Sequence, residues 1–189
     1  LDIQDNYTTG VITATLEART AAQLLVETVS GTNDIVSGNN LAFDVSDATL
    51  TTTQLTELNS MTTGTIDFTN GGAVTITGTA AELKSIFDLS VADGNNGILS
   101  TALADAIVTV SDTNPSAADL EAINAATSGA ITITAATRIT GLLADVNLVL
   151  ADAGTTYTGE GAEAITLTDA TISASALATL LVNGAGLTT

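Results

Sequence analysis

The stretch FDVSDATLTTTQLTEL, residues 43–58, decides the predicted fold, because the chain repeats it twice. Its counterparts are VTVSDTNPSAADLEAI at residues 108–123 and TLTDATISASALATL at residues 166–180. Each copy carries an aspartate at the same place, and these residues are Asp47, Asp112 and Asp169. Self-similarity of this kind is typical of repeat proteins, in which each unit covers the apolar face of its neighbour.

A recurring tripeptide marks where each repeat begins. It reads Thr8-Thr9-Gly10, then Thr62-Thr63-Gly64, then Thr127-Ser128-Gly129. Together with the aspartate-bearing stretches, it predicts one domain over residues 1–189, with repeats at 8–61, 62–126 and 127–187. Residues 1–7 resemble the end of a preceding repeat, and the sequence stops where another would begin. We therefore expect a segment of a longer array.

The second half of each repeat predicts a helix with a defined start. A hydroxyl residue lies four positions after each aspartate, at Thr51, Ser116 and Ser173. Its side-chain oxygen can accept a hydrogen bond from a backbone N–H that the first helical turn leaves unpaired. Gln54 lies three residues after Thr51, where a capping-box partner belongs. Leucine or isoleucine then recurs at a three-residue spacing, as in Leu177 and Leu180, and gives a narrow apolar stripe.

The first half of each repeat also contains helix starts. Thr20-Ala-Ala-Gln23 and Thr79-Ala-Ala-Glu82 are capping-box sequences. In the third repeat Leu142 replaces the threonine, and Thr140 is the predicted cap there.

Strands are predicted before these helices. AVTITG at residues 73–78 and AITIT at residues 130–134 alternate between apolar residues and threonine, which is the period of a β-strand. TIDF at residues 65–68 is a candidate for a separate strand at a corner of the chain.

These elements predict an α/β fold built as a repetitive βα solenoid. The expected form is similar to leucine-rich repeats, with successive strands side by side in a parallel sheet and helices on one face. The alternative is a right-handed parallel β-helix. Capped segments with a leucine stripe favour the form with helices.

Composition excludes many functions. The 189 residues include 21 acidic and three basic side chains, with no histidine and no cysteine, and the net charge is −18. Such a charge repels nucleic acid and anionic membranes. Disulfides, zinc fingers and Ser-His-Asp triads need residues that the chain lacks. No apolar run is long enough to predict membrane insertion. No cofactor is required, and the oxygen ligands that remain suit hard cations such as Ca²⁺.

Two loops carry the candidate calcium ligands. The first, residues 31–40, contains Asn33 and Asp34 between glycines, and the second, residues 91–97, contains Asp93 and Asn95. The first loop resembles a calcium-binding nonapeptide of the RTX β-roll family, GGxGxDxUx, although Thr32 replaces its second glycine. The resemblance implies calcium held between successive turns. Surface loops with ordinary Asn-Gly turns are the competing interpretation, and the one we favour.

The recurring aspartates also have two interpretations. Asp47, Asp112 and Asp169 could form a ladder of carboxylates that binds calcium. Alternatively, each carboxylate satisfies backbone N–H groups in an Asx turn, which would explain one such residue per repeat. The second interpretation is favoured.

The repeat units VTITGTAAEL and VTVSDTNPSAADLEAINAATSG resemble those of long, acidic, cysteine-free secreted or cell-surface proteins of marine bacteria and cyanobacteria, of the RTX-adhesin or surface-layer type. The resemblance implies an extracellular, non-enzymatic extension module. Its partners would be neighbouring repeats, and a surface glycan or another cell-surface protein. The alternatives are a calcium-dependent ligand- or carbohydrate-binding module and, less favoured, a β-helix polysaccharide-degrading enzyme.

Overall fold

A computed structural model describes residues 13–26, 40–69, 71–90, 97–98, 100–152, 156–159 and 163–183. The chain divides into two compact units. Unit 1 comprises residues 1–76 with 86–106, and unit 2 comprises residues 77–85 with 107–189. The fold is α/β, with parallel strands and short helices, as the sequence predicts.

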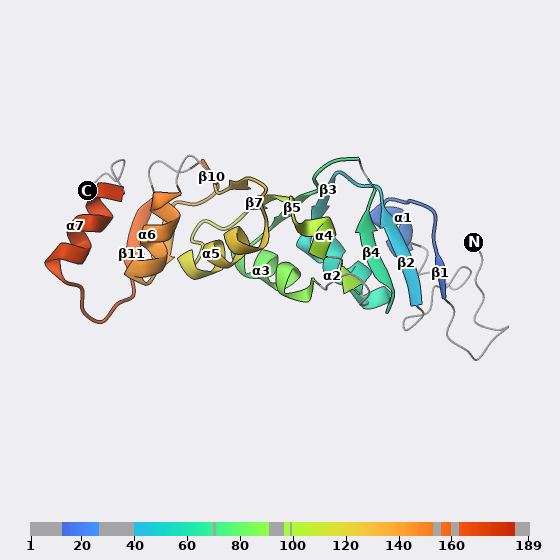
Figure 1. The fold of residues 1–189 in the computed structure, drawn as a ribbon, viewed down its shortest axis with the longest axis horizontal. Helices are drawn as coiled ribbons and strands as arrows, with labels where there is room; N and C mark the ends of the chain where they lie inside the picture. Colours follow the sequence, from blue (N-terminus) through green and yellow to red (C-terminus); the bar gives the residue numbers. More distant parts are fainter. Residues whose placement is uncertain are drawn as a thin grey trace. The chain divides into compact units, whose positions relative to one another are not determined.

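Unit 1 contains a sheet with strand order β1-β2-β4-β6, in which the neighbouring strands are parallel. Figure 1 shows β2 and β4 side by side. In the register of this pair, Phe43 lies opposite Ile66. Both side chains are buried, as are Leu55 and Leu58 of α2. The elements are β1 (Thr13–Thr15), α1 (Ala21–Val26), β2 (Asn40–Val45), β3 (Thr49–Thr51), α2 (Thr52–Met61), β4 (Thr65–Phe68), β6 (Gly97–Ile98) and α4 (Ser100–Leu103).

Unit 2 contains neighbouring strands in the order β10-β8-β7 and a separate pair, β11 and β9, and both sets are parallel. Its core includes Val108, Leu120 and Ile123, all fully buried. The elements are β7 (Ile107–Val110), α5 (Ala117–Ala126), β8 (Ile131–Thr132), β9 (Arg138–Gly141), α6 (Leu143–Ala151), β10 (Tyr157–Thr158), β11 (Ala164–Leu167) and α7 (Ala174–Asn183). The boundary between the units crosses β5 (Thr75–Gly78) and α3 (Ala80–Leu89).

The leucine-rich-repeat-like form predicts that successive strands lie side by side in one sheet. The described strands are instead divided among three sheets. TIDF forms β4 and TITG forms β5, and these two strands belong to different sheets. The predicted corner between them is therefore confirmed. Gly71, which lies between them, has a φ of 78°, a left-handed conformation that glycine adopts at little cost. Strand alternation alone does not reveal which sheet each of the two strands joins.

The predicted helix starts are confirmed wherever a hydroxyl residue occupies the cap. Thr51 accepts a hydrogen bond from the N–H of Gln54 (3.2 Å), and the side chain of Gln54 accepts one from the N–H of Thr51 (2.9 Å). The pairs Thr20–Gln23 and Thr79–Glu82 make the same reciprocal bonds. Ser116 and Ser173 accept from the N–H groups of Asp119 and Ala176, respectively.

The predicted cap of α6 is wrong. The helix begins after Leu142, whose side chain makes no capping bond. The hydroxyl of Thr140 instead donates to Asn114 (2.9 Å), because Thr140 is part of β9 and pairs with Ser116. The start of α6 is satisfied from another part of the chain, described below.

The tripeptide at the start of the second repeat ends one helix and fixes the next strand. Thr62 follows α2 in extended conformation, and its Oγ1 accepts hydrogen bonds from Leu41 (3.0 Å) and Gly64 (2.8 Å) while it donates to the Leu41 carbonyl (2.5 Å). These bonds hold Gly64 so close to β2 that a Cβ on it would overlap the carbonyl of Leu41. In the third repeat, Thr127 likewise accepts from Gly129 (3.0 Å). The tripeptide is therefore a backbone junction.

Candidate functional site

The four predicted calcium ligands, Asn33, Asp34, Asp93 and Asn95, lie outside the residues that the structure describes. Calcium binding in these loops therefore stays a prediction. Among the described residues, no group of three or more carboxylates is placed to hold a metal ion.

The calcium prediction is tested by thermal unfolding. If a loop binds Ca²⁺ in the folded state alone, millimolar CaCl₂ should raise the melting temperature by several degrees over EDTA. Equal MgCl₂ is the control, because the net charge of −18 makes screening by any divalent cation stabilising. Equal melting temperatures in CaCl₂ and MgCl₂ would remove specific calcium binding from the account.

The three recurring aspartates make the same contact in each repeat. The Oδ2 atom of Asp47 accepts a hydrogen bond from the N–H of Ala21 (2.6 Å). Asp112 accepts one from the N–H of Ala80 (2.5 Å), and Asp169 one from the N–H of Leu143 (2.7 Å). Each donor is the first residue of a helix, α1, α3 or α6. In each repeat the contact joins the end of the strand of the second βα half to the helix start of the first half.

Backbone hydrogen bonds set up this contact. The residue before each aspartate donates its N–H to the carbonyl two residues before the helix: Ser46 to Arg19 (2.9 Å), Ser111 to Gly78 (2.8 Å) and Thr168 to Gly141 (3.0 Å). Strand pairing thus runs up to the aspartate, which places its carboxylate against the helix N-terminus.

The aspartates are therefore N-terminal caps supplied by a distant part of the chain. A helix start leaves N–H groups without helical partners and carries a partial positive charge, so a carboxylate stabilises it in two ways. The predicted role, an acceptor for backbone N–H groups, holds, but the partner differs from that of an Asx turn. It lies 26, 32 and 26 residues earlier in the chain rather than two residues later. In α6 this contact is made without a hydroxyl cap, whereas α1 and α3 have both.

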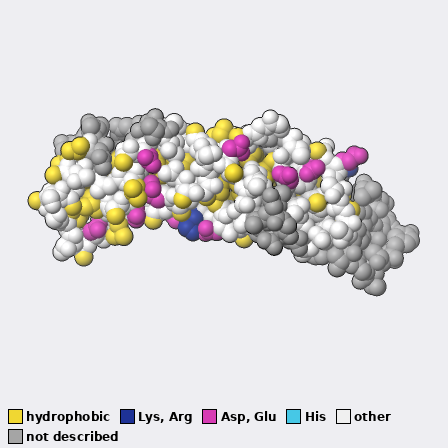
Figure 2. Space-filling model, viewed as in Figure 1, with side chains coloured by type: hydrophobic (Ala, Val, Ile, Leu, Met, Phe, Trp, Pro, Cys, Tyr) yellow, Lys and Arg dark blue, Asp and Glu magenta, His cyan; other side chains and the backbone are white. Residues whose placement is uncertain are grey.

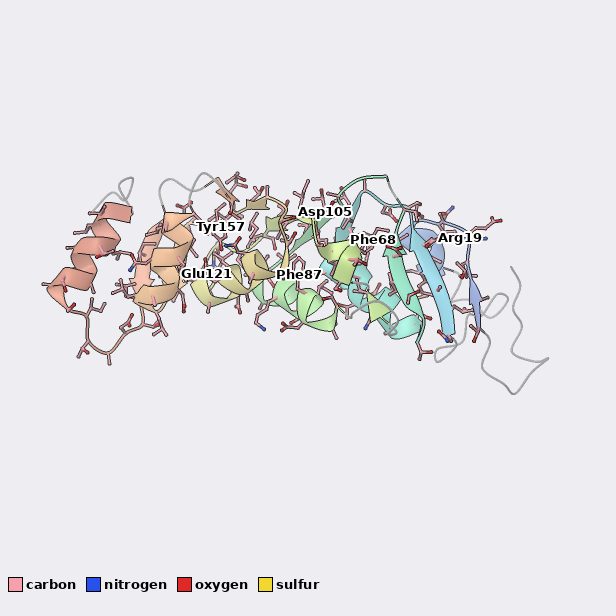
Figure 3. The ribbon with its side chains drawn as sticks, in the orientation of Figure 1. Arg19, Phe68, Phe87, Asp105, Glu121 and Tyr157 are labelled. Carbon is pink, nitrogen blue, oxygen red and sulfur yellow. The ribbon has the colours of Figure 1, made fainter. Side chains whose placement is uncertain are left out.

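A second cluster joins α5 to β10 within unit 2. The hydroxyl of Tyr157, a fully buried side chain, donates to Glu121 (3.0 Å), and the two residues lie beside each other in Figure 3. On the same helix, the amide of Asn124 donates to Asp152 (3.2 Å). Sequence reasoning missed this pair. The available signal was a tyrosine, rare in this chain, that would need a hydrogen-bond partner if buried.

Glu121 is the carboxyl group of this cluster whose protonation is perturbed. Burial raises the pKa of Glu121 above its ordinary value of 4.5, and the negative charges of Asp152 and Asp145 raise it further. The hydrogen bond from Tyr157 acts in the opposite direction and lowers the pKa. The folded state consequently holds the Glu121 proton more tightly than the unfolded chain does.

Replacing Glu121 with glutamine should stabilise unit 2 at neutral pH. A raised pKa in the folded state means that stability is greatest below pH 4.5 and falls as pH rises through the folded-state pKa. Glu121→Gln keeps an oxygen that can accept from Tyr157 and removes the charge. We expect a melting temperature about 1–3 °C higher at pH 7, with no gain at pH 4.

Asp105→Asn is the matched control for Glu121→Gln, because it removes one negative charge from an exposed residue of unit 1. An equal gain for both variants would assign the effect to net charge instead of to the surroundings of Glu121.

Within the described part of the chain, no helix is long and apolar enough to cross a membrane. Comparison of the chain with protein-family models, with curated proteins and with solved structures gave no match. Function is therefore inferred from the geometry of the repeat contacts.

Proposed function

We propose that this chain is a structural extension module of a secreted or cell-surface bacterial protein and is not an enzyme. In this proposal the repeats form a βα solenoid, and each repeat serves as the platform on which the next one stacks. The observation that carries the proposal is the recurring aspartate cap, made by Asp47, Asp112 and Asp169 in the three repeats.

The cap supports a structural function because the three recurring aspartates use their carboxylates for hydrogen bonds within the fold. Each of these carboxylates is hydrogen-bonded to a helix N-terminus of the preceding half. Each cap therefore joins the two βα halves of one repeat, and the halves are the units that stack in the proposed solenoid.

The acidic composition supports the same function. Among the described residues, carboxylates are spread over both units, for example Asp67, Asp105 and Asp145, and the acidic side chains visible in Figure 2 are dispersed over the surface. Net charge far from zero keeps a long array soluble and separates it from other anionic surfaces.

Small-angle X-ray scattering of tandem arrays tests the extension function. Proteins with one, two and three copies of the full sequence are compared at the same mass concentration. A stacked module predicts a maximum dimension that rises by an equal increment with each added copy. Copies that collapse on one another, or that move independently on flexible joints, would contradict the proposal.

The location is tested separately in the source cells. Antibodies against the chain should label intact cells or the secreted fraction. Labelling that appears only after lysis would refute the surface assignment and leave the stacking geometry unaffected.

A further inference from the structure

The chain offers few bonds to proteases that cleave after a basic residue, the class typified by trypsin. Its three basic residues are Arg19, Lys84 and Arg138, and all three lie in the part of the chain that the structure describes. Such a protease hydrolyses the peptide bond that follows the basic residue, using one water molecule to leave a carboxylate and an ammonium group. Arg138 is exposed, and Arg19 and Lys84 are half-buried. Whether a bond is cut therefore depends on its backbone rather than on access to the charge.

The bond after Arg19 lies between two hydrogen-bonded parts of unit 1. The N–H of Arg19 donates to the carbonyl of Asp44, and its carbonyl accepts from the N–H of Ser46, both at 2.9 Å. Two residues later Ala21 begins α1, and its N–H donates to the carboxylate of Asp47 (2.6 Å). A protease that draws this segment into its own cleft has to break these three hydrogen bonds.

The bond after Arg138 lies in a strand that has neighbours on both sides. Arg138 begins β9, and its N–H donates to the carbonyl of Thr113 (3.2 Å). On its other side β9 pairs in parallel with β11, where Arg138 lies opposite Ala164 and Ile139 opposite Ile165. Ile139, the residue that follows the bond, is fully buried. Cleavage here requires β9 to leave both neighbours and to expose part of the core.

The bond after Lys84 lies inside helix α3. The carboxylate of Asp112 accepts the N–H of Ala80 at the start of this helix (2.5 Å). Ser85, which follows the bond, donates its hydroxyl to the carbonyl of Ala81 (2.9 Å). A protease reaches this bond only after the helix unwinds, which breaks the helical hydrogen bonds on both sides of Lys84.

We propose that the folded chain withstands proteases that cleave after lysine or arginine, because each of its three cleavable bonds lies in hydrogen-bonded backbone that has to open before hydrolysis. Cleavage of a folded protein follows the population of locally open states, and exposed segments without secondary structure are cut most readily. The described part of the chain contains such a segment at residues 168–173, between β11 and α7, and residues 170–173 are all exposed. This segment contains no lysine or arginine. The protection does not depend on the extension function, although it would preserve a module that lies outside the cell.

Digestion of the full chain with trypsin tests the proposal, with the initial rate at each bond measured by mass spectrometry of the fragments. Thr171→Arg places a cleavable bond in the exposed segment 168–173. Trypsin should cut this new bond at least about 100-fold faster than any of the three natural bonds. Natural bonds that are cut as fast as the new one would overturn the proposal. A Thr171→Arg protein that resists cleavage after residue 171 would also overturn it, because resistance would then not depend on where the basic residues lie.

Asp47→Ala tests whether local opening controls the cleavage. Loss of the cap at Ala21 makes opening near Arg19 more frequent, so cleavage after Arg19 should become about tenfold faster. Cleavage after Arg138, which lies in unit 2, should change by less than about twofold. Asp105→Asn is the control, because it removes one negative charge from an exposed residue of unit 1 and should leave cleavage after Arg19 within about twofold of the wild type. Equal changes at Arg19 and Arg138 in the Asp47→Ala protein, or no change at Arg19, would overturn the proposal. None of these outcomes bears on the extension function, which the scattering experiment tests independently.

Discussion

Gly64→Ala should destabilise unit 1 by about 3 kcal/mol or more, because its new Cβ would occupy the space of the Leu41 carbonyl. The clash is with backbone, which side-chain rotation cannot relieve. The approach is fixed by the hydrogen bonds that join Thr62 to both backbone groups of Leu41. Moving the backbone to remove the overlap would therefore break the hydrogen bonds between Thr62 and Leu41. Urea unfolding of the variant measures the loss.

Gly72→Ala is the matched control for this substitution. Gly72 lies in the same unit, and a Cβ there would meet nothing within 4 Å. We expect a change within about 0.5 kcal/mol, as for most surface substitutions. If the two variants were equally stable, the junction would be looser than the structure shows, and the tripeptide would not require its glycine.

Asp112→Ala is expected to have the second-largest effect, a loss of about 1–2 kcal/mol. The substitution leaves the first N–H of α3 without its carboxylate and removes a negative charge from the helix N-terminus. Asp112→Asn keeps an amide oxygen as acceptor and should recover about half of the loss. The loss is measured by urea unfolding, and protection of the α3 amides against hydrogen exchange should fall in the same order. A fully stable Asp112→Ala protein would mean that the cap contributes nothing to the fold.

Local features of the fold were predictable from the sequence because they depend on neighbouring residues. Capping boxes such as Thr51–Gln54 place donor and acceptor three residues apart, and the structure forms them. The alternation in β5 likewise reflects one buried and one half-buried face, with Ile76 fully buried. The division of consecutive strands between sheets was harder to predict, because strand pairing joins residues that are far apart in the sequence.

The partners of the recurring and buried polar residues were less predictable, because they lie far away in the sequence. The recurrence of Asp47, Asp112 and Asp169 indicated a backbone acceptor, but the helix start that each one caps is set by strand pairing. For Thr140, the predicted role itself was wrong. Its position suggested a cap, and its place in β9 directs the hydroxyl to Asn114. The pairing of Glu121 with Tyr157 crosses 36 residues, and the tyrosine itself does not indicate which residue is its partner.

A double-mutant cycle between Asp112 and Ala80 tests most directly the claim that the aspartates join successive parts of the chain. Ala80→Pro removes the donor N–H, and proline is well tolerated at the first position of a helix. Any cost of the proline ring itself cancels in the cycle. If the hydrogen bond between Asp112 and Ala80 carries the cap, Asp112→Ala should cost about 1 kcal/mol less in the Ala80→Pro background than in the wild type. Additive effects, within about 0.3 kcal/mol, would contradict the account.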